Sequence, residues 1–206
     1  MIFLRADPHN PVLAEAVAIL AQGGVIAYPT ETVYGLGAAI SCHAALLRIS
    51  AIKGRSGIKA LSYMVDSVAR ALALSGNLPG YVHDLIQRYW PGPLTLVVEA
   101  SPDVPGHAVS ENGTIGLRMP DNQICRTLVG KLDDAIATTS ANVSGEPPAC
   151  SAEAVYAALG EQVDLIIDGG TSRLAISSTV LDVTGKEPAL LRQGAIPFSD
   201  IINNMR

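Results

Sequence analysis

The stretch that decides the fold reads Tyr28-Pro29-Thr30-Glu31-Thr32-Val33-Tyr34-Gly35-Leu36-Gly37. An apolar run over residues 25–28 leads into it, which predicts a buried strand that delivers hydroxyl groups and bare backbone to one place. Ligands of α/β proteins usually bind where such strands end. The two glycines are expected to let the backbone turn without a side chain filling the space. An ordinary loop after a strand is the alternative, and this stretch alone does not decide between them.

Helical and strand patterns alternate over the rest of the chain. Helices are expected over residues 11–20, 41–52, 67–74, 78–89, 121–129, 151–159 and 198–203, with Asn10, Ser41 and Asp121 as caps of the first, second and fifth. Strands are expected over residues 25–28, 60–65, 94–98, 113–118, 135–138, 163–167, 179–183 and 189–191. Several strands follow one another closely in the second half. This order predicts an α/β domain with a mixed sheet.

The composition is that of one globular domain. The chain has 206 residues, 49% hydrophobic and 16% charged, which is enough for one sizeable core, so we expect a single domain over residues 1–206. Cys42, Cys125 and Cys150 are odd in number and widely spaced, which argues against a disulfide framework and a structural zinc site. No signal peptide and no membrane-spanning stretch is expected, so the predicted location is the cytoplasm.

The charge balance bears on partners. A net charge of -5 weighs against a general nucleic-acid coat protein, because non-specific binding depends on neutralising phosphates with Lys and Arg. A local basic cleft stays open.

Cations stand at the ends of several elements. Lys53 and Arg55 flank a glycine after a helix, where they can hold a phosphate or a carboxylate. A solvated helix end is the alternative, since the helix dipole favours cations there. Arg118 closes an otherwise apolar strand and is a candidate to hold a carboxylate. Arg192 repeats this pattern after a later strand.

Small polar residues recur at other strand ends. Ser140 and Asn142 lie in a run of small residues that can form an anion nest, although a tight turn is the alternative. Ser178 stands directly before a strand. Together with the cations, these residues predict a shared cleft that binds anions.

Acid–base groups are scarce in this set. The four histidines share no ligand spacing, so no metal site is expected. Glu31 can serve as a base, but a Glu among polar residues is more often solvated or capping. A site of this kind works by positioning and charge neutralisation, as adenylyl transfer does.

Seven short motifs occur in an order and spacing that resemble the YrdC family. They are PTETVYGLG at 29–37, K-x-R at 53–55, PGPLT at 91–95, RMP at 118–120, TSANVSG at 139–145, STV at 178–180 and LRQG at 191–194. The resemblance implies an α/β fold whose twisted mixed sheet, flanked by helices, surrounds a deep basic concave cleft. It also implies a nucleotidyltransferase that makes threonylcarbamoyl-AMP and pyrophosphate from L-threonine, bicarbonate or CO2, and ATP, for the threonylcarbamoyl-adenosine modification of tRNA.

The resemblance also implies site residues. L-threonine is expected against Thr32, Arg118, Thr138 and Ser178, with Arg118 facing its carboxylate. ATP is expected against Arg55, Lys59, Thr114, Ser140 and Arg192, and Lys53, Arg55, Ser140 and Asn142 form the catalytic K-x-R and S-x-N signatures around the phosphates. Mg²⁺ is expected with the nucleotide, held mainly by phosphates and water. A tRNA threonylcarbamoyl transferase complex is the expected downstream partner.

The sequence departs from the family pattern after the K-x-R motif. Residues 56–60 lack two prolines that many members have, and Met64 stands where they have a histidine. Both changes put the affinity for substrates in doubt more than the type of reaction. The chain otherwise resembles the short form, without the additional C-terminal domain of longer members.

Two other functions stay open. A YrdC-fold protein that binds double-stranded RNA or tRNA without catalysis is one, although the acidic composition disfavours it. A divergent paralogue that acts on a different acceptor is the other, and the altered loop at residues 56–60 is its best support.

Overall fold

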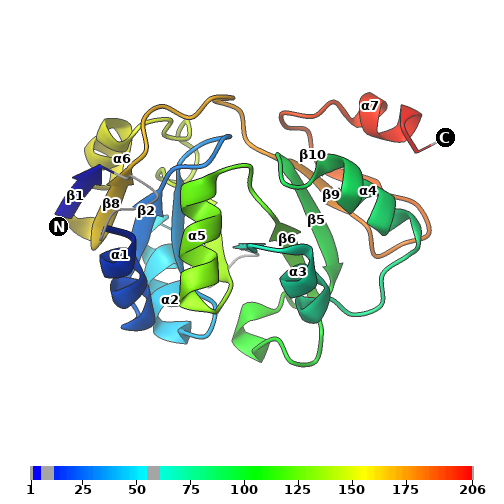
Figure 1. The fold of residues 1–206 in the computed structure, drawn as a ribbon, viewed down its shortest axis with the longest axis horizontal. Helices are drawn as coiled ribbons and strands as arrows, with labels where there is room; N and C mark the ends of the chain where they lie inside the picture. The colour runs from blue at the N-terminus through cyan, green and yellow to red at the C-terminus, as the bar shows by residue number, and fades with distance from the viewer. Residues whose placement is uncertain (1, 6–11, 55–60, 206) are drawn as a thin grey trace.

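Figure 1 shows the fold in a computed structural model that describes residues 2–5, 12–54 and 61–205. The helices are α1 (Val12–Ala21), α2 (His43–Ile52), α3 (Val68–Leu74), α4 (Tyr81–Tyr89), α5 (Gln123–Leu132), α6 (Ala152–Leu159) and α7 (Phe198–Asn203), with short 3-10 turns η1 (Gly106–Ala108) and η2 (Gly160–Gln162). The strands are β1 (Ile2–Arg5), β2 (Ile26–Tyr28), β3 (Gly35–Ala39), β4 (Ser62–Met64), β5 (Leu94–Glu99), β6 (Thr114–Arg118), β7 (Ile136–Ser140), β8 (Leu165–Asp168), β9 (Thr179–Asp182) and β10 (Ala189–Arg192).

The strands form one mixed sheet in the order β1-β8-β2-β3-β7-β4-β6-β5-β9-β10. Parallel pairing joins β1 to β8, β8 to β2, β4 to β6 and β5 to β9, and the remaining neighbours are antiparallel. The predicted α/β fold with a mixed sheet is confirmed. Strands β1 and β3 were not predicted, and β3 reads GLGAA, with two residues of a type that is depleted in strands.

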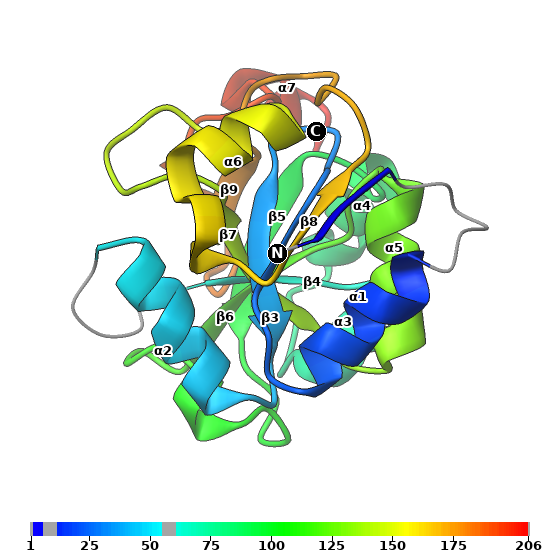
Figure 2. The same cartoon turned by 90° about the vertical axis from the view of Figure 1, so that its left-hand side faces the viewer.

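Alternation along the strands assigns side chains to the two faces of the sheet. Ile26 and Tyr28 of β2 belong to an apolar cluster with residues of α1 and α5. Ala27, between them, belongs to a second cluster with residues of α2 and α6. In Figure 2, α1 and α5 lie on one side of the sheet, and α2 and α6 lie on the other.

The face that α1 and α5 cover becomes polar further along the sheet. Met64 of β4 and Ile136 of β7 still belong to the apolar cluster on this face. Two residues away along these strands, Ser62 and Thr138 are register partners, and Arg118 of β6 is the partner of Met64. Because register partners and alternate residues share a face, neighbouring strands gather polar side chains at one place.

Gly35 and Gly37 lie inside β3 and leave room for the ring of Tyr28. A Cβ atom on Gly35 would lie 3.0 Å from Tyr28 Cζ, and one on Gly37 would lie 2.9 Å from Tyr28 Cε1. The expectation that these glycines let the backbone turn is therefore wrong. They are needed because a buried ring crosses the neighbouring strand.

Two predicted caps are also wrong. Helix α2 follows Cys42, not Ser41, and has no side-chain cap. At α5 the amide oxygen of Asn122, not Asp121, accepts a hydrogen bond from the backbone of Cys125 at 3.1 Å, because Asn122 has the extended conformation of an N-cap. The predicted cap Asn10 lies outside the described residues. Across the described ranges, no helix is both long and apolar enough to cross a bilayer.

The space at Gly37 predicts a cost for one added methyl group. In Gly37→Ala the new Cβ would lie 2.6 Å from Ile136 Cγ2 and 3.0 Å from the carbonyl oxygen of Ala137, so a strand or the Tyr28 ring has to shift. We expect the free energy of unfolding, measured in urea, to fall by about 1–3 kcal/mol.

Gly80→Ala is the matched control, because nothing lies within 4 Å of its Cβ. It should unfold within about 1 kcal/mol of the wild type. If both variants kept the wild-type unfolding midpoint, the close packing of Tyr28 on β3 would not constrain the sheet.

Candidate active site

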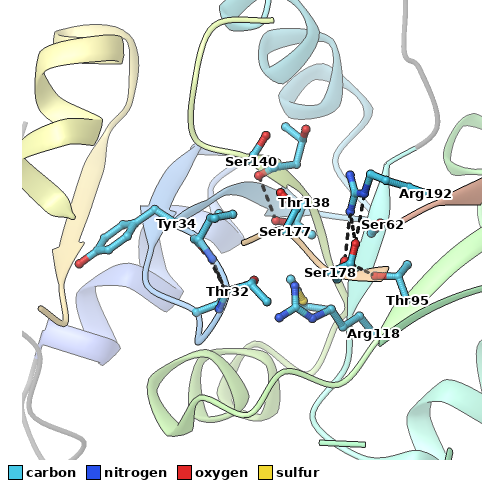
Figure 3. Close-up of a pocket in the computed structure, with 15 residues that line it drawn as sticks. Thr32, Tyr34, Ser62, Thr95, Arg118, Thr138, Ser140, Ser177, Ser178 and Arg192 are labelled. Carbon is cyan, nitrogen blue, oxygen red and sulfur yellow. Dashed lines mark hydrogen bonds between the residues drawn. The ribbon is translucent and has the colours of Figure 1, made fainter. Parts of the chain in front are cut away.

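A pocket of about 280 Å³ opens where the polar face of the sheet meets the loop after β2 (Figure 3). Hydroxyl side chains and two arginines make up most of its polar wall. The lining residues are Thr30, Thr32, Val33, Tyr34, Gly35, Ser62, Met64, Thr95, Arg118, Thr138, Thr139, Ser140, Ser177, Ser178 and Arg192. The sheet thus brings together segments that are far apart in the sequence.

The pocket gathers many of the predicted site residues, but not all. Those that line it are Thr32, Arg118, Thr138, Ser140, Ser178 and Arg192. Arg55 and Lys59 lie outside the described residues, so their placement stays a prediction. Lys53, Asn142 and Thr114 are described but are not part of the pocket wall.

A buried ion pair joins Arg118 to Glu31. Arg118 Nη2 donates to Glu31 Oε1 at 2.7 Å, and the two side chains are only 6% and 3% exposed. The second oxygen, Oε2, is buried and has no hydrogen-bond partner in the described part of the chain. The expectation that Glu31 is solvated or capping is therefore wrong. A buried guanidinium needs a counter-charge, and Glu31 supplies it.

Arg118 keeps part of its hydrogen-bonding capacity for a ligand. Its Nε donates to the carbonyl oxygen of Gly92 at 3.2 Å, and its Nη2 donates to Glu31. A guanidinium carries five N–H groups, and no described residue accepts from Nη1. Because Arg118 lines the pocket, these donors suit a carboxylate bound there.

A bulge in the edge strand places a second guanidinium in the pocket. The register of β10 shifts between Leu190 and Arg192, and such bulges change the direction of a side chain. Arg192 Nη2 donates to Ser178 Oγ at 3.1 Å, and that hydroxyl lies 2.8 Å from Thr95 Oγ1. Burial, and then the charge of Arg118, lower the pKa of Arg192. Two repelling cations favour an anionic ligand between them.

Thr30 fixes the loop that joins β2 to β3. Its Oγ1 donates to the carbonyl oxygen of Val33 at 2.7 Å and accepts from the backbone N–H groups of Thr32 and Val33 at 3.2 and 3.3 Å. Thr32 Oγ1 lies 2.8 Å from Thr30 Oγ1. The carbonyl of Glu31 accepts from Leu174 N at 2.8 Å, which attaches residues 169–178 to this loop. These bonds hold Thr32 at the pocket wall.

Tyr28 holds another hydroxyl of the wall. Its OH donates to Thr138 Oγ1 at 2.7 Å. Burial raises the pKa of Tyr28 well above its usual range, so the phenol stays protonated. Tyr28 of β2 thus holds Thr138 of β7 across β3, the strand that lies between them.

Lys53 orders the loop after β7. Its side chain is buried, and Nζ donates to the carbonyl oxygen of Ser140 at 2.6 Å and to Asn142 Oδ1 at 2.8 Å. Asn142 Nδ2 in turn donates to the carbonyl oxygens of Val143 and Glu146. The alternative of a solvated helix end is wrong for Lys53. The contacts of Lys53 and Asn142 are those of positioning residues for Ser140.

Thr114 lies at the opposite end of β6 from Arg118. Alternate residues place both on one face, but four residues of a strand span about 13 Å. Thr114 Oγ1 contacts Ser110 Oγ at 2.8 Å instead. The structure does not bring Thr114 into the pocket.

The geometry can be compared with known proteins. A family model described as "Telomere recombination" (Sua5_yciO_yrdC) matches residues 18–194. The chain belongs to the Sua5/YciO/YrdC family. The predicted resemblance to the YrdC family is therefore confirmed.

Solved family members share this fold, and curated relatives are similar in sequence over most of this chain. Threonylcarbamoyl-AMP synthase of Pyrococcus abyssi is 38% identical over 186 residues, which are 90% of this chain and 55% of the relative. The crystal structure of P. abyssi Sua5 complexed with L-threonine matches with a TM-score of 0.92 at 36% identity, over 98% of this chain and 59% of that chain. Escherichia coli YciO matches with a TM-score of 0.85 at 30% identity, over 94% and 95% of the two chains. The chain spans about half the length of the first curated relatives.

Nine residues that line the pocket were not among the predicted site residues: Thr30, Val33, Tyr34, Gly35, Ser62, Met64, Thr95, Thr139 and Ser177. For Ser62 and Thr95 a signal exists, because each is a small hydroxyl residue within a largely apolar strand. A strand that is buried on both faces has little reason to carry one unless that position faces a ligand or a partner.

The ion pair predicts that Glu31→Gln destabilises the fold, because the change removes the charge while keeping the shape. The buried Arg118 then lacks its counter-charge, and the free energy of unfolding in urea should fall by about 3 kcal/mol. Asp121→Asn is the matched control. It removes the half-exposed charge that faces Arg173 and Arg126, and such surface pairs contribute less than about 1 kcal/mol each. Equal losses in the two variants would contradict the assignment.

Proposed function

We propose that this chain makes threonylcarbamoyl-AMP from L-threonine, bicarbonate or CO2, and ATP, with release of pyrophosphate. The observation that carries this proposal is a pocket in which two guanidinium groups, Arg118 and Arg192, lie among threonine and serine hydroxyls. This wall suits a hydroxylated amino acid beside a phosphate. Relatives named threonylcarbamoyl-AMP synthase and a Sua5 structure that contains L-threonine support the same function.

L-threonine is assigned to the part of the pocket near the β2–β3 loop. The free donors of Arg118 take its carboxylate, since guanidinium and carboxylate match in charge and geometry. The hydroxyls of Thr32, Thr138 and Ser178 surround the rest of the amino acid.

ATP is assigned to the side of Arg192 and Ser140. Arg55 and Lys59, which lie outside the described residues, are expected to add charge there. A triphosphate with its nucleoside is long enough to extend along β6, which is how Thr114 can contact the same molecule although it lies outside the pocket. Lys53 and Asn142 keep Ser140 in place.

The proposed chemistry has two steps. The amine of threonine attacks CO2, or bicarbonate with loss of water, and a proton leaves the nitrogen as the carbamate forms. A carbamate oxygen then attacks the α-phosphorus of ATP, the bond to the β-phosphate oxygen breaks, and pyrophosphate leaves with the electron pair. Arg192, together with Arg55, binds the charge that spreads over the phosphate oxygens.

Magnesium is proposed to arrive with the nucleotide. The described residues contain no group of three His, Cys, Asp or Glu side chains that would hold a metal ion. Phosphate oxygens and water are therefore the proposed ligands, which agrees with the way Mg²⁺ is usually bound beside nucleotides.

The surface charges weigh against an RNA-binding function. Arg48, Arg70, Arg126 and Arg173 are each paired with an aspartate. Paired arginines have less charge left for a phosphate backbone. We place the product upstream of a tRNA threonylcarbamoyl transferase in the cytoplasm, so that RNA need not bind this chain.

A direct assay tests the proposal. The purified chain is incubated with ATP, L-threonine and bicarbonate, and threonylcarbamoyl-AMP and pyrophosphate are measured. Pyrophosphate release should require both threonine and bicarbonate, because the nucleophile is made from them. Thr32→Val, Arg55→Ala and Ser140→Ala should each reduce the rate, and Thr32→Val should affect the threonine dependence with ATP binding intact.

The alternatives predict other outcomes. Release of pyrophosphate without threonine would point to a paralogue with a different acceptor. Tight binding of RNA without adenylate formation would favour the binding module, and full activity of Ser140→Ala would mean that the site is misplaced.

Arg192 gives a prediction for one substrate. Arg192→Gln removes a charge that contacts a phosphate, and a hydrogen bond to a charged group contributes about 1.5–3 kcal/mol, so the KM for ATP should rise about 10- to 100-fold. The KM for threonine should change much less. Arg88→Gln is the control, because Arg88 is exposed on α4 outside this pocket. A rise confined to the threonine KM would assign Arg192 to the amino acid instead.

A further inference from the structure

Two hydroxyls on the pocket wall have opposite hydrogen-bonding roles toward the residues behind them: one donates to its neighbour and the other accepts. Both Thr32 and Thr138 are buried and line the pocket (Figure 3). A threonine hydroxyl has one proton to donate and two lone pairs to accept with. The partner behind each hydroxyl therefore decides what remains for a ligand.

The proton of Thr32 is used within the β2–β3 loop. Thr30 Oγ1 lies 2.7 Å from the carbonyl oxygen of Val33, and a carbonyl cannot donate, so the single proton of Thr30 points there. The 2.8 Å contact between the two threonine hydroxyls then requires Thr32 to be the donor. Thr32 is left with lone pairs, so it presents an acceptor to the pocket.

Thr138 has the reverse arrangement. The OH of Tyr28 lies 2.7 Å from Thr138 Oγ1, and no other described residue accepts from this phenol. A buried donor without an acceptor is costly, so Tyr28 donates and Thr138 accepts. The proton of Thr138 has only a long contact of 3.5 Å, with the carbonyl oxygen of Thr139. It is free to point into the pocket, where Thr138 presents a donor.

We propose that Tyr28 is a positioning residue that leaves the Thr138 proton to the ligand, so that the pocket offers a donor at Thr138 and an acceptor at Thr32. This inference rests on the proposed function, because it concerns how the amino acid is selected. A ligand hydroxyl can accept from Thr138 and donate to Thr32, whereas a methyl group can do neither. The pocket thereby selects β-hydroxy amino acids over amino acids of the same size without the hydroxyl.

The test measures binding of single amino acids by calorimetry, without ATP. L-threonine is compared with L-2-aminobutyrate, which has the same skeleton without the hydroxyl. The wild type should bind threonine more tightly. Tyr28→Phe removes only the phenol oxygen, so the Thr138 hydroxyl can turn to other partners. Its threonine affinity should fall about five- to tenfold, the value of one hydrogen bond, and its 2-aminobutyrate affinity should stay unchanged.

A double variant distinguishes a positioning role of Tyr28 from a general loss of structure in the pocket. Thr138→Val should lose the preference for threonine, and adding Tyr28→Phe to it should cause no further loss, because the two residues act as one unit. Tyr63→Phe is the matched control. Tyr63 is also buried and donates to a backbone carbonyl, that of Ala108, but it does not line the pocket, so the ratio of the two affinities should stay at the wild-type value.

The outcomes distinguish this inference from the proposed function. If the wild type bound no threonine at all, the proposed function would fail first. If the wild type preferred threonine and Tyr28→Phe kept that preference, the positioning role would be refuted while the function stood. Equal loss of affinity for both amino acids in Tyr28→Phe would show a structural effect instead, and would also refute the proposal.

Discussion

The buried pair of Glu31 and Arg118 is the contact on which the site depends. Arg118 ends a central strand, and its charge is tolerated there because Glu31 faces it at 2.7 Å. Thr30 and Thr32, on either side of this glutamate, line the pocket. The backbone carbonyl oxygen of Glu31 accepts a hydrogen bond from the backbone N–H of Leu174, in the segment that leads to β9. The ion pair and this backbone hydrogen bond thus join three separate segments at Glu31. An acid at this position is a structural requirement of a site that keeps a guanidinium buried for a ligand.

The two-residue repeat of the strands explains why the remaining groups meet at this place. Where α1 and α5 cover the sheet, alternate residues are apolar, as in Ile136. Two residues further along the same strand stands Thr138, and its register partner on β4 is Ser62. The strands themselves therefore supply Ser62 and Thr138 to the wall. The β2–β3 loop adds Thr30 and Thr32.

Much of the fold could be predicted from the sequence, because apolar periodicity is local information. Arg118 could be found for the same reason, since a charge at the end of an apolar strand is unusual. Its partner could not, because Glu31 lies 87 positions away and stands among polar residues that resemble an exposed loop. Strand β3 was missed because glycine is uncommon in strands, and the reason for these glycines is the ring of Tyr28, which packs against them in the fold. What sequence reasoning lacks in each case is the identity of a distant partner.

The chemistry of the wall limits how it can act. Among the described residues that line the pocket there is no His, Asp, Glu, Lys or Cys. Tyr34 lines it too, but its OH donates to the carbonyl oxygen of Gly170, and burial raises its pKa to about 12, so it does not act as a base near neutral pH. Proton transfer by the described wall is therefore a poor explanation of the proposed reaction. The wall can instead act through its fixed charges and its oriented hydroxyls. Such groups lower the barrier of a reaction only if they are already oriented before the substrates bind. The partners behind the wall, Glu31 for Arg118 and Tyr28 for Thr138, supply that preparation.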